Sequence, residues 1–553
     1  MLAMTRKKMR MDVWFVITIV LLLLYILFLI YPLGNLFKMA FHNGEHFTLD
    51  YFITFFTKKY YTVTIANSFK VSTAATIVSM IVGVTMGYFY AVYEIKLAKT
   101  VRMCVILATM SAPFVGAYAW ILLLGRNGAI TVFLQKLFPA IEIPSIYGFG
   151  GILLVFTTQL FPLVFLYIVG AMSKMDNSLM EASLNMGCSG IRRFFKVIIP
   201  LIMPSILASA LLVFIRALSD FGTPLLLGEG YRTFPVALYN EFVGEVSQNK
   251  GFASAIAIVA ILITCVIYII QNIATAKTSF AMNALNPVPK KKLKGLPNIL
   301  VHFYIYLVTG IAILPQVYVT YCSFRNTSGQ LYVEGYSLDS YRDMFGRLGR
   351  SVLNTITIPL TSLVFVLVIA VLIAYISVRR RNALTSTVDM ISMIPYIIPG
   401  TVVGIAMVTS FNKEPLILTA TTSIMIISLV IRRLPYTIRS SVATLQQIPI
   451  SIEEAAISLG SSKLKTFVKI TVPMMSSGII AGAILSWVTL ITELSTAIFL
   501  YTSRTQTLTV AIYTQIVRGH YGVASAMATL LTLITIVSMV VFNLVNPDGD
   551  VTL

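Results

Sequence analysis

Long apolar runs alternate with short polar, cation-rich segments along the chain. Twelve of the runs are long enough to cross the roughly 30 Å hydrocarbon core of a bilayer as helices. The expected spans lie at about 13–33, 66–93, 101–125, 148–172, 197–228, 252–274, 298–321, 352–378, 386–410, 415–434, 472–500 and 522–545. The pattern therefore predicts an all-α polytopic membrane protein with about twelve transmembrane helices in two sets of six.

One of the polar segments occurs twice. Residues 181–200 read EASLNMGCSGIRRFFKVIIP, residues 454–473 read EAAISLGSSKLKTFVKITVP, and the two align without a gap. Gly187 and Gly460 stand where a helix can end in the left-handed conformation that glycine adopts freely. Each copy predicts a short helix, a turn and a basic amphipathic segment, which is too polar to lie in hydrocarbon.

The duplicated segment resembles the EAA loop of binding-protein-dependent ABC importer permeases. In that family the loop forms a coupling helix that inserts into a cleft of the ATP-binding subunit. An amphipathic hairpin on the membrane surface would have a similar composition, but two copies in matching contexts favour the permease. The resemblance assigns the coupling role to Glu181, Ala182, Ser183, Gly187, Glu454, Ala455, Ala456 and Gly460.

The regions around the two copies form an internal repeat. A first permease domain is expected at 1–285 and a second at 298–553, joined by a basic, proline-containing linker at 286–297. Since each half has six helices, an even number, both insert in the same orientation and the repeat is parallel. A parallel repeat differs from the inverted repeats of many secondary transporters.

Local correspondences support this repeat. Pro162 matches Pro435 in the fourth helix of each half. Asn67 matches Asn354 where the second helix of each half is expected to begin, so both are candidate N-caps. The first half also has an additional stretch at 125–147, which is predicted to lie outside the cell.

Composition and charge agree with the membrane assignment and orient it. The 553 residues are 57% hydrophobic and only 11% charged, against about a quarter charged in soluble proteins. The net charge of +20 comes from cations at the ends of apolar runs, as the positive-inside rule requires, and gives no continuous face for a nucleic acid. Both termini are expected in the cytoplasm of a prokaryote, on the same side as Arg432, Arg433 and Arg439.

Two carboxylates fall inside predicted spans at equivalent positions. Asp220 follows Glu181 by 39 residues (220 − 181), as Glu493 follows Glu454 (493 − 454). An intramembrane carboxylate costs several kcal/mol unless it faces protein, water or a partner. Arg216, one helical turn before Asp220, is a candidate partner, whereas Glu493 needs a partner from elsewhere.

Two interpretations of the carboxylates stay open. They can line a translocation path and favour cations or hydroxyl-rich solutes, or they can hold the helices in register, because the small residues around them suit close packing. The candidate path or gate residues are Arg216, Ser219, Asp220, Gly222, Thr223, Thr492, Glu493, Ser495 and Thr496.

The chain has no G-x-x-x-x-G-K-[ST] phosphate loop. We therefore expect a transport subunit that has no catalytic residues and binds no cofactor, with ATP-Mg held by separate ATPase subunits. The segment His42-Asn-Gly-Glu-His46 fits the H-x-x-E-H pattern, but a zinc site of that type needs a helix and a third ligand. No metal site is expected.

Within these permeases, the fused arrangement and the stretches Ser219–Gly228 and Glu493–Leu500 resemble the ferric-iron class. The resemblance implies import, with an extracytoplasmic binding protein delivering the solute and two ATPase subunits docked below. Ferric iron is the leading solute, and thiamine, phosphonates, sugar phosphates and polyamines remain alternatives. An ion-coupled secondary transporter is a lower alternative, against which the parallel repeat argues.

Overall fold

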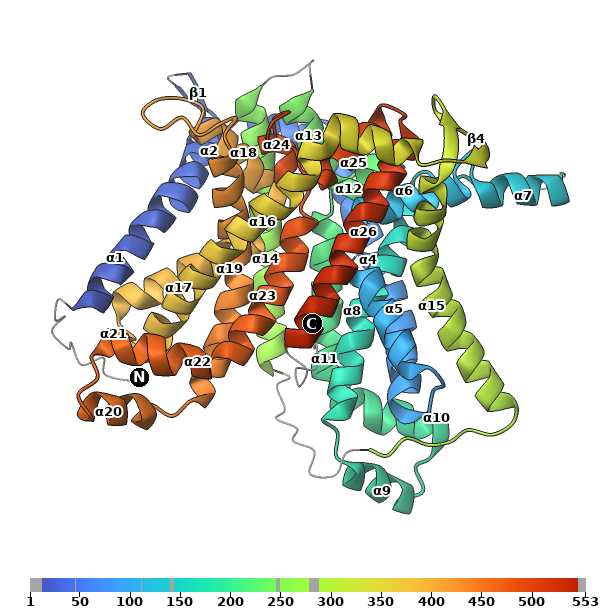
Figure 1. The fold of residues 1–553 in the computed structure, drawn as a ribbon, viewed down its shortest axis with the longest axis horizontal. Helices are drawn as coiled ribbons and strands as arrows, with labels where there is room; N and C mark the ends of the chain where they lie inside the picture. The colour runs from blue at the N-terminus through green and yellow to red at the C-terminus, as the bar shows by residue number, and fades with distance from the viewer. Residues whose placement is uncertain are drawn as a thin grey trace. The chain divides into compact units, whose positions relative to one another are not determined.

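The computed structural model describes residues 12–44, 46–110, 112–139, 144–244, 249–277 and 288–545. Contacts divide the chain into two compact units, whose helices and strands are labelled in Figure 1. The smaller unit comprises the described residues within 1–47, 351–507 and 539–550, and the larger unit comprises those within 48–350 and 508–538.

Nearly all regular structure in the described residues is helical. The larger unit contains α3 (Asp50–Thr57), α4 (Lys59–Val92), α5 (Ala98–Met110), α6 (Pro113–Leu124), α7 (Ala129–Leu137), α8 (Phe149–Ser173), α9 (Asn177–Asn185), α10 (Gly190–Arg193), the π-helical η2 (Phe194–Ile198), α11 (Ile199–Ser219), α12 (Gly222–Leu227), α13 (Phe234–Val243), α14 (Lys250–Lys277), α15 (Leu296–Ser323), β3 (Arg325–Ser328), β4 (Leu331–Tyr336) and α25 (Leu508–Val517). The smaller unit contains α1 (Val13–Tyr25), the π-helical η1 (Ile26–Ile30), α2 (Tyr31–Phe41), β1 (His42–Asn43), β2 (His46–Phe47), α17 (Ala383–Ile397), α18 (Gly400–Ser410), α19 (Thr422–Gln447), α20 (Ser451–Ser458), α21 (Lys463–Thr466), the π-helical η3 (Phe467–Thr471), α22 (Val472–Met474), α23 (Ser476–Ile491) and α24 (Ala497–Leu500). The helices α16 (Asp339–Arg379) and α26 (Tyr521–Val545) contribute residues to both units.

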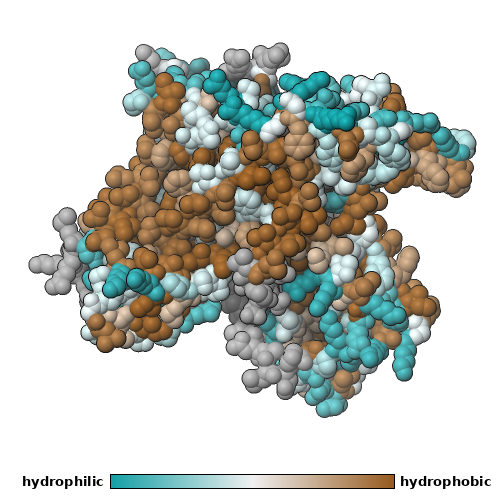
Figure 2. All heavy atoms as spheres, viewed as in Figure 1, coloured by the Kyte–Doolittle hydropathy of each residue, from teal (hydrophilic) through white to brown (hydrophobic). Residues whose placement is uncertain are grey.

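The all-α polytopic fold is confirmed. In the described residues nine helices are long and apolar enough to cross a membrane, and two bent pairs raise the number to eleven, against about twelve predicted. The bent pairs are α17 with α18, at 110°, and Lys463–Met474 with α23, at 70°. Hydrophobic side chains cover the middle lengths of the helices, and hydrophilic ones gather at their ends (Figure 2).

The compact units do not follow the predicted domains 1–285 and 298–553. The first helix of the chain lies in the smaller unit, where the Trp14 ring is 4.4 Å from the Tyr375 ring. Conversely, α15, the first helix of the second repeat, packs against α5 and α6 in the larger unit. The domain boundaries therefore stay a prediction about the sequence repeat.

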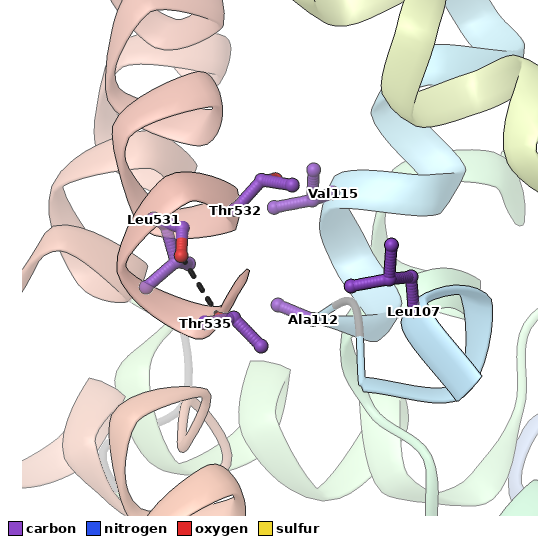
Figure 3. A pocket seen from close by; sticks show the side chains of 6 residues that line it. All are labelled: Leu107, Ala112, Val115, Leu531, Thr532 and Thr535. Carbon is purple, nitrogen blue, oxygen red and sulfur yellow. Dashed lines mark hydrogen bonds between the residues drawn. The ribbon is translucent and has the colours of Figure 1, made fainter. Parts of the chain in front are cut away.

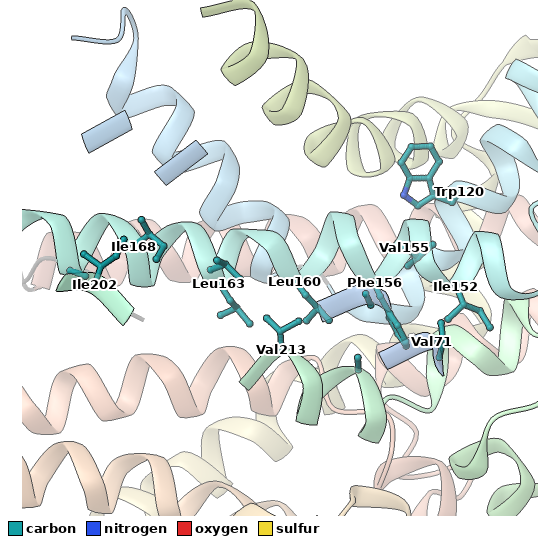
Figure 4. Close-up of a cluster of buried hydrophobic side chains, with 14 of the residues drawn as sticks. Val71, Trp120, Ile152, Val155, Phe156, Leu160, Leu163, Ile168, Ile202 and Val213 are labelled. Atoms are coloured by element: carbon teal, nitrogen blue, oxygen red, sulfur yellow. The ribbon is translucent and has the colours of Figure 1, made fainter. Parts of the chain in front are cut away.

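Small residues allow close contact between the central helices of each unit. Along α4, Gly83 and Gly87 lie against Val164 and Ile168 of α8. In the smaller unit, Ser440 of α19 donates a hydrogen bond to the carbonyl of Gly478 in α23 at 2.7 Å. Around the α4–α8 contact lies the apolar core of the larger unit, in which α8 contributes side chains along most of its length (Figure 4).

Each π-helical segment precedes a proline. The segments η1, η2 and η3 are followed directly by helices with Pro32, Pro200 and Pro473 in their first turns. Proline has no N–H, and its ring crowds the carbonyl four residues before it, so a locally wider helix relieves the conflict. We name the duplicated segments at 181–200 and 454–473, with the helices α9 and α20 that they contain, the coupling segments, after the role that their resemblance implies. Since η2 and η3 occupy the same place in these two segments, the repeat extends to this backbone detail.

Several expected boundaries were wrong. The span at 101–125 is interrupted, because α5 ends at Met110 and α6 begins at Pro113. The stretch at 125–147 contains the helix α7. Asn67 and Asn354 are not N-caps, since α4 and α16 begin well before them. Their amides instead donate to the carbonyls of Arg232 and Arg504, which lie in the loops after α12 and α24.

The α4–α8 contact gives a stability prediction. A Cβ at Gly83 would lie 2.5 Å from Val164 Cβ and 2.8 Å from the Phe161 carbonyl oxygen, so Gly83→Ala should cost about 1–3 kcal/mol through overpacking. Gly170→Ala, in α8, is the matched control because nothing lies within 4 Å of its added Cβ. Thermal unfolding of the purified protein in detergent measures both, and equal midpoints would contradict the packing argument.

Candidate functional site

The two coupling segments share one backbone design. The helix α9 ends at Asn185, and its C-cap Met186 is followed by Gly187 with φ of +74°. The helix α20 ends at Ser458, and its C-cap Leu459 is followed by Gly460 with φ of +89°. The left-handed turn predicted at both glycines is confirmed, since a side chain there would be strained. Each segment therefore presents a short helix, a sharp turn and a basic helix, as in the lower part of Figure 1.

The two segments are anchored by different chemistry. The buried Glu453 accepts hydrogen bonds from Arg379 Nε at 2.8 Å and from the Tyr375 hydroxyl at 3.0 Å. Arg379 also donates to the carbonyl of Ile448 at 2.7 Å. At the equivalent place in the first segment, 273 residues earlier (453 − 180), stands the buried Met180. Sequence comparison of the copies missed Glu453 because only Glu454 has a matching glutamate.

The predicted coupling residues divide between the two sides of these helices. Ser183 and Ala456 are buried and face their own unit. The others are exposed: Glu181, Ala182, Gly187, Glu454, Ala455 and Gly460. Next to each glycine stands an apolar side chain in water, Met186 at 86% and Leu459 at 90% exposure. Exposed apolar groups at matching places are typical of a protein-docking surface.

Asp220 and Glu493 lie at helix breaks, and not within continuous spans as predicted. The helix α11 ends at Ser219 and α12 starts at Gly222, while α23 ends at Ile491 and α24 starts at Ala497. Each carboxylate accepts a hydrogen bond at 3.0 Å from the backbone N–H three residues later, that of Thr223 or Thr496. The carboxylates thus satisfy N–H groups that the broken helix would otherwise leave unpaired.

Glu493 is buried and bound by two arginines of α19. Its Oε1 accepts from Arg432 Nη1 at 2.5 Å, and its Oε2 accepts from Arg433 Nη2. Arg432 Nη1 also donates to the Thr496 hydroxyl at 2.9 Å, which in turn donates to the carbonyl of Gly400 at 3.1 Å. This Glu493 network joins α19, the α23–α24 break and the start of α18.

Arg432 and Arg433 therefore do not lie in a polar segment at the end of a span, where their expected cytoplasmic placement put them. Both arginines lie inside α19, which continues to Gln447, and their guanidinium groups are largely buried. The internal repeat could have predicted that the two arginines lie inside a helix, because Pro435 of α19 matches Pro162, which lies in the interior of α8. Three residues before each proline stand Arg432 and Gln159.

Asp220 has a different environment. Its Oδ2 accepts from the Thr223 hydroxyl at 3.4 Å, and in the described part of the chain no ion pair joins it to Arg216. The positions equivalent to Arg432 and Arg433 are Gln159 and Leu160 (432 − 273 and 433 − 273). The first repeat thus holds its carboxylate with hydroxyl and backbone groups, where the second uses two guanidinium groups.

The remaining candidate residues lie close to these two breaks. Ser219 and Gly222 flank Asp220, and Thr492 lies beside Glu493, where its hydroxyl donates to the Val488 carbonyl at 2.8 Å. Ser495 lies two residues after Glu493, within the same break between α23 and α24. The structure therefore gathers the candidates of each repeat around its own carboxylate.

No metal centre is found among the described residues. No group of three His, Cys, Asp or Glu side chains could hold a metal ion there. His42 and His46 lie on the hairpin β1–β2, and Glu45 of the H-x-x-E-H segment lies outside the described residues. A cavity of about 10 Å³ between α26 and the α5–α6 break (Figure 3) has room for one water at most. It is lined by Leu107, Ala112, Val115, Leu531, Thr532 and Thr535.

Comparison with known proteins adds to this geometry. A family model described as binding-protein-dependent transport system inner membrane component matches residues 79–279 and 366–548. The ferric transport system permease protein FbpB of Actinobacillus pleuropneumoniae is 29% identical over 567 aligned residues, which cover 99% of this chain and 80% of the relative. The putative ferric transport system permease protein FbpB 1 of Haemophilus influenzae is 29% identical over 524 residues, covering 90% of this chain and 80% of that protein. A solved bacterial ABC transporter involved in the import of the acidic polysaccharide alginate has a TM-score of 0.42 and 16% identity, covering 48% of this chain and 96% of that one.

The different environments of Asp220 and Glu493 give a second prediction. Glu493→Gln leaves two buried guanidinium groups without a carboxylate, which typically costs about 3–5 kcal/mol. Asp220→Asn keeps an oxygen that can accept from Thr223 and should cost about 1 kcal/mol or less. Thermal unfolding in detergent should therefore give a much lower midpoint for Glu493→Gln. Equal losses of stability would contradict the asymmetry.

Proposed function

Because the chain belongs to the family of binding-protein-dependent transport system inner membrane components and is the permease of an ABC importer, we propose that ferric iron is the solute that it moves. The observation that supports ferric iron as the solute is the similarity, over 99% of the chain, to a ferric transport system permease protein. The fused two-repeat arrangement supports it, since that relative is matched by both repeats together. The solute would arrive on an extracytoplasmic binding protein.

ATP hydrolysis belongs to separate subunits in this proposal. The two coupling segments offer two equivalent docking surfaces, so two ATPase subunits would bind, each with ATP-Mg. Met186 and Leu459 stand at the tips of these surfaces and would enter apolar clefts of the ATPases. The anchoring of the second segment through Glu453 and Arg379 would transmit the movement of its ATPase to the membrane helices.

The docking surfaces of the coupling segments also indicate on which side of the membrane the two termini would lie. Asp12, at the start of α1, lies 3.5 Å from Lys463 in the second coupling segment. This contact supports a cytoplasmic N-terminus, because the coupling segments must face the ATPases. An even number of spans would bring the C-terminus to the same side of the cell membrane of a prokaryote.

The two carboxylates would have different roles in transport. Glu493 is paired with two arginines and holds helices together. Asp220 has no guanidinium partner among the described residues and is partly exposed, so its negative charge is available to a passing cation. We assign the cation-contacting role to Asp220, with Ser219, Gly222 and Thr223 around it, and the packing role to Glu493.

The docking surfaces give a third prediction. Met186→Glu combined with Leu459→Glu should reduce co-purification of the ATPase at least about tenfold, because two apolar contacts would become buried charges. Both side chains are almost fully exposed, so the variant should fold normally. The control is Phe47→Glu with Leu331→Glu, two exposed positions on the hairpins β1–β2 and β3–β4. Unchanged co-purification would remove the coupling role from these residues.

A fourth prediction tests the solute. In nanodiscs with the ATPase and the binding protein, the iron-loaded binding protein should stimulate ATP hydrolysis, whereas the empty protein should not. Asp220→Asn should lower iron uptake about tenfold, the size expected for one lost charged contact, while the ATPase still co-purifies. A stable ATPase complex that iron does not stimulate would exclude iron and leave thiamine, phosphonate, sugar phosphate or polyamine. Normal uptake by Asp220→Asn would return Asp220 to a packing role.

A further inference from the structure

The linker between the repeats is fastened to the larger unit. Within it, residues 288–295 run beside the end of α4, and we name them the strap. The backbone N–H of Lys291 donates to the Val92 carbonyl at 2.8 Å, and the Glu94 N–H donates to the Lys291 carbonyl at 3.1 Å. Val288 packs against the apolar core. A flexible tether would need none of these contacts, so the strap has a defined place on the protein surface.

The backbone contacts of the strap bring its lysines next to the cations of the α4–α5 turn and of α5. Lys290 Nζ lies 4.8 Å from the centre of the Tyr90 ring, and the Tyr90 hydroxyl donates to the carbonyl of Ala98, the first residue of α5, at 3.1 Å. Lys292 Nζ lies 3.7 Å from the Glu94 carboxylate. Within residues 92–102 and 288–300 there are seven cations and one carboxylate, a net charge of +6 (7 − 1). The cations are Lys96, Lys99, Arg102, Lys290, Lys291, Lys292 and Lys294.

Apolar side chains are exposed beside these cations. Leu97 stands between the lysines of the α4–α5 turn with φ of +56° and 71% exposure. A left-handed leucine is uncommon, and here the backbone holds its side chain away from the protein. The first turns of α15, which follow the strap directly, expose Leu296, Ile299, Leu300 and Phe303. The cations thus border a surface suited to lipid chains.

The α4–α5 turn is fixed in this place by α15. The backbone N–H of Lys96 donates to His302 Nε2 at 3.3 Å, and the Tyr306 hydroxyl donates to the Lys96 carbonyl at 2.8 Å. The strap, the turn and the start of α15 therefore form one surface, whose shape does not depend on a ligand. We name the exposed part of it, comprising Lys96, Leu97, Lys99, Lys290, Lys291, Lys292 and Lys294, the strap surface.

We propose that the strap surface binds the headgroups of anionic phospholipids. Clusters of four to eight cations next to the cytoplasmic end of a transmembrane helix attract anionic lipid, with about 1 kcal/mol per lysine near the surface. The exposed Leu97 and the apolar first turns of α15 favour a lipid over a soluble anion, because they offer contacts to the acyl chains. The strap surface shares no residue with the coupling segments or with the breaks at Asp220 and Glu493, so the proposal does not depend on the identity of the solute.

The test is lipid binding by the purified full chain in detergent, measured by native mass spectrometry during titration with phosphatidylglycerol or phosphatidylcholine. Wild type should retain phosphatidylglycerol preferentially. Replacing the four strap lysines by glutamine (Lys290→Gln, Lys291→Gln, Lys292→Gln and Lys294→Gln) should lower the affinity for phosphatidylglycerol at least about tenfold. The control removes four exposed cations elsewhere, with Lys58→Gln, Lys59→Gln, Arg347→Gln and Arg350→Gln. An unchanged affinity in the strap variant, or an equal loss in the control, would overturn the proposal.

Two further measurements separate a lipid from a soluble anion. Millimolar inorganic phosphate should not displace the bound phosphatidylglycerol, and displacement would overturn the assignment to lipid. Leu97→Asn keeps every charge, and asparagine tolerates the left-handed conformation, so this variant should fold normally. It should still weaken the binding of phosphatidylglycerol several-fold, and an unchanged affinity would contradict the acyl-chain contact.

Discussion

A carboxylate away from water needs hydrogen-bond donors or a cation within reach, and the smaller unit is built around one group that meets this need. The Glu493 carboxylate accepts hydrogen bonds from two guanidinium groups of α19 and from the backbone N–H of Thr496. The Thr496 hydroxyl extends the network to Gly400, where the bent pair α17–α18 begins its second helix. One buried ion cluster therefore joins three elements of the smaller unit, and its two cations and one anion can be tolerated only together.

The first repeat uses the same backbone geometry without the arginines. Asp220 stands at the same helix break and accepts from Thr223 as Glu493 accepts from Thr496. The guanidinium groups of the second repeat are replaced by Gln159 and by the apolar Leu160. A parallel repeat thus keeps its backbone shape while the residues around its two carboxylates differ in charge.

The coupling segments show the same combination of equal backbone and different chemistry. Both place a glycine in the left-handed region and an exposed apolar side chain before it, yet one is anchored by Met180 and the other by Glu453 with Arg379. The π-helical turns that follow have a common cause in the prolines after them. The strap adds a feature of the linker alone, since it fastens four lysines beside the end of α4 without any counterpart within a repeat.

Much of this protein could be predicted from local patterns. The apolar runs predicted the membrane helices, and the duplicated segment predicted the turns at Gly187 and Gly460, because hydrocarbon and turn geometry impose requirements on residues close in the sequence. The same local rules placed Arg432 and Arg433 at the end of a span, since cations after an apolar run indicate a cytoplasmic end. This expectation fails where a buried carboxylate pairs with the cations. That carboxylate, Glu493, is about sixty residues away, so only the packing of α23 on α19 could bring the charges together. Tertiary structure likewise decided that α1 lies with helices of the second repeat and that Lys291 lies beside Val92. Contacts between distant segments depend on how whole helices pack, whereas a hydropathy pattern reports only on the solvent that each helix meets.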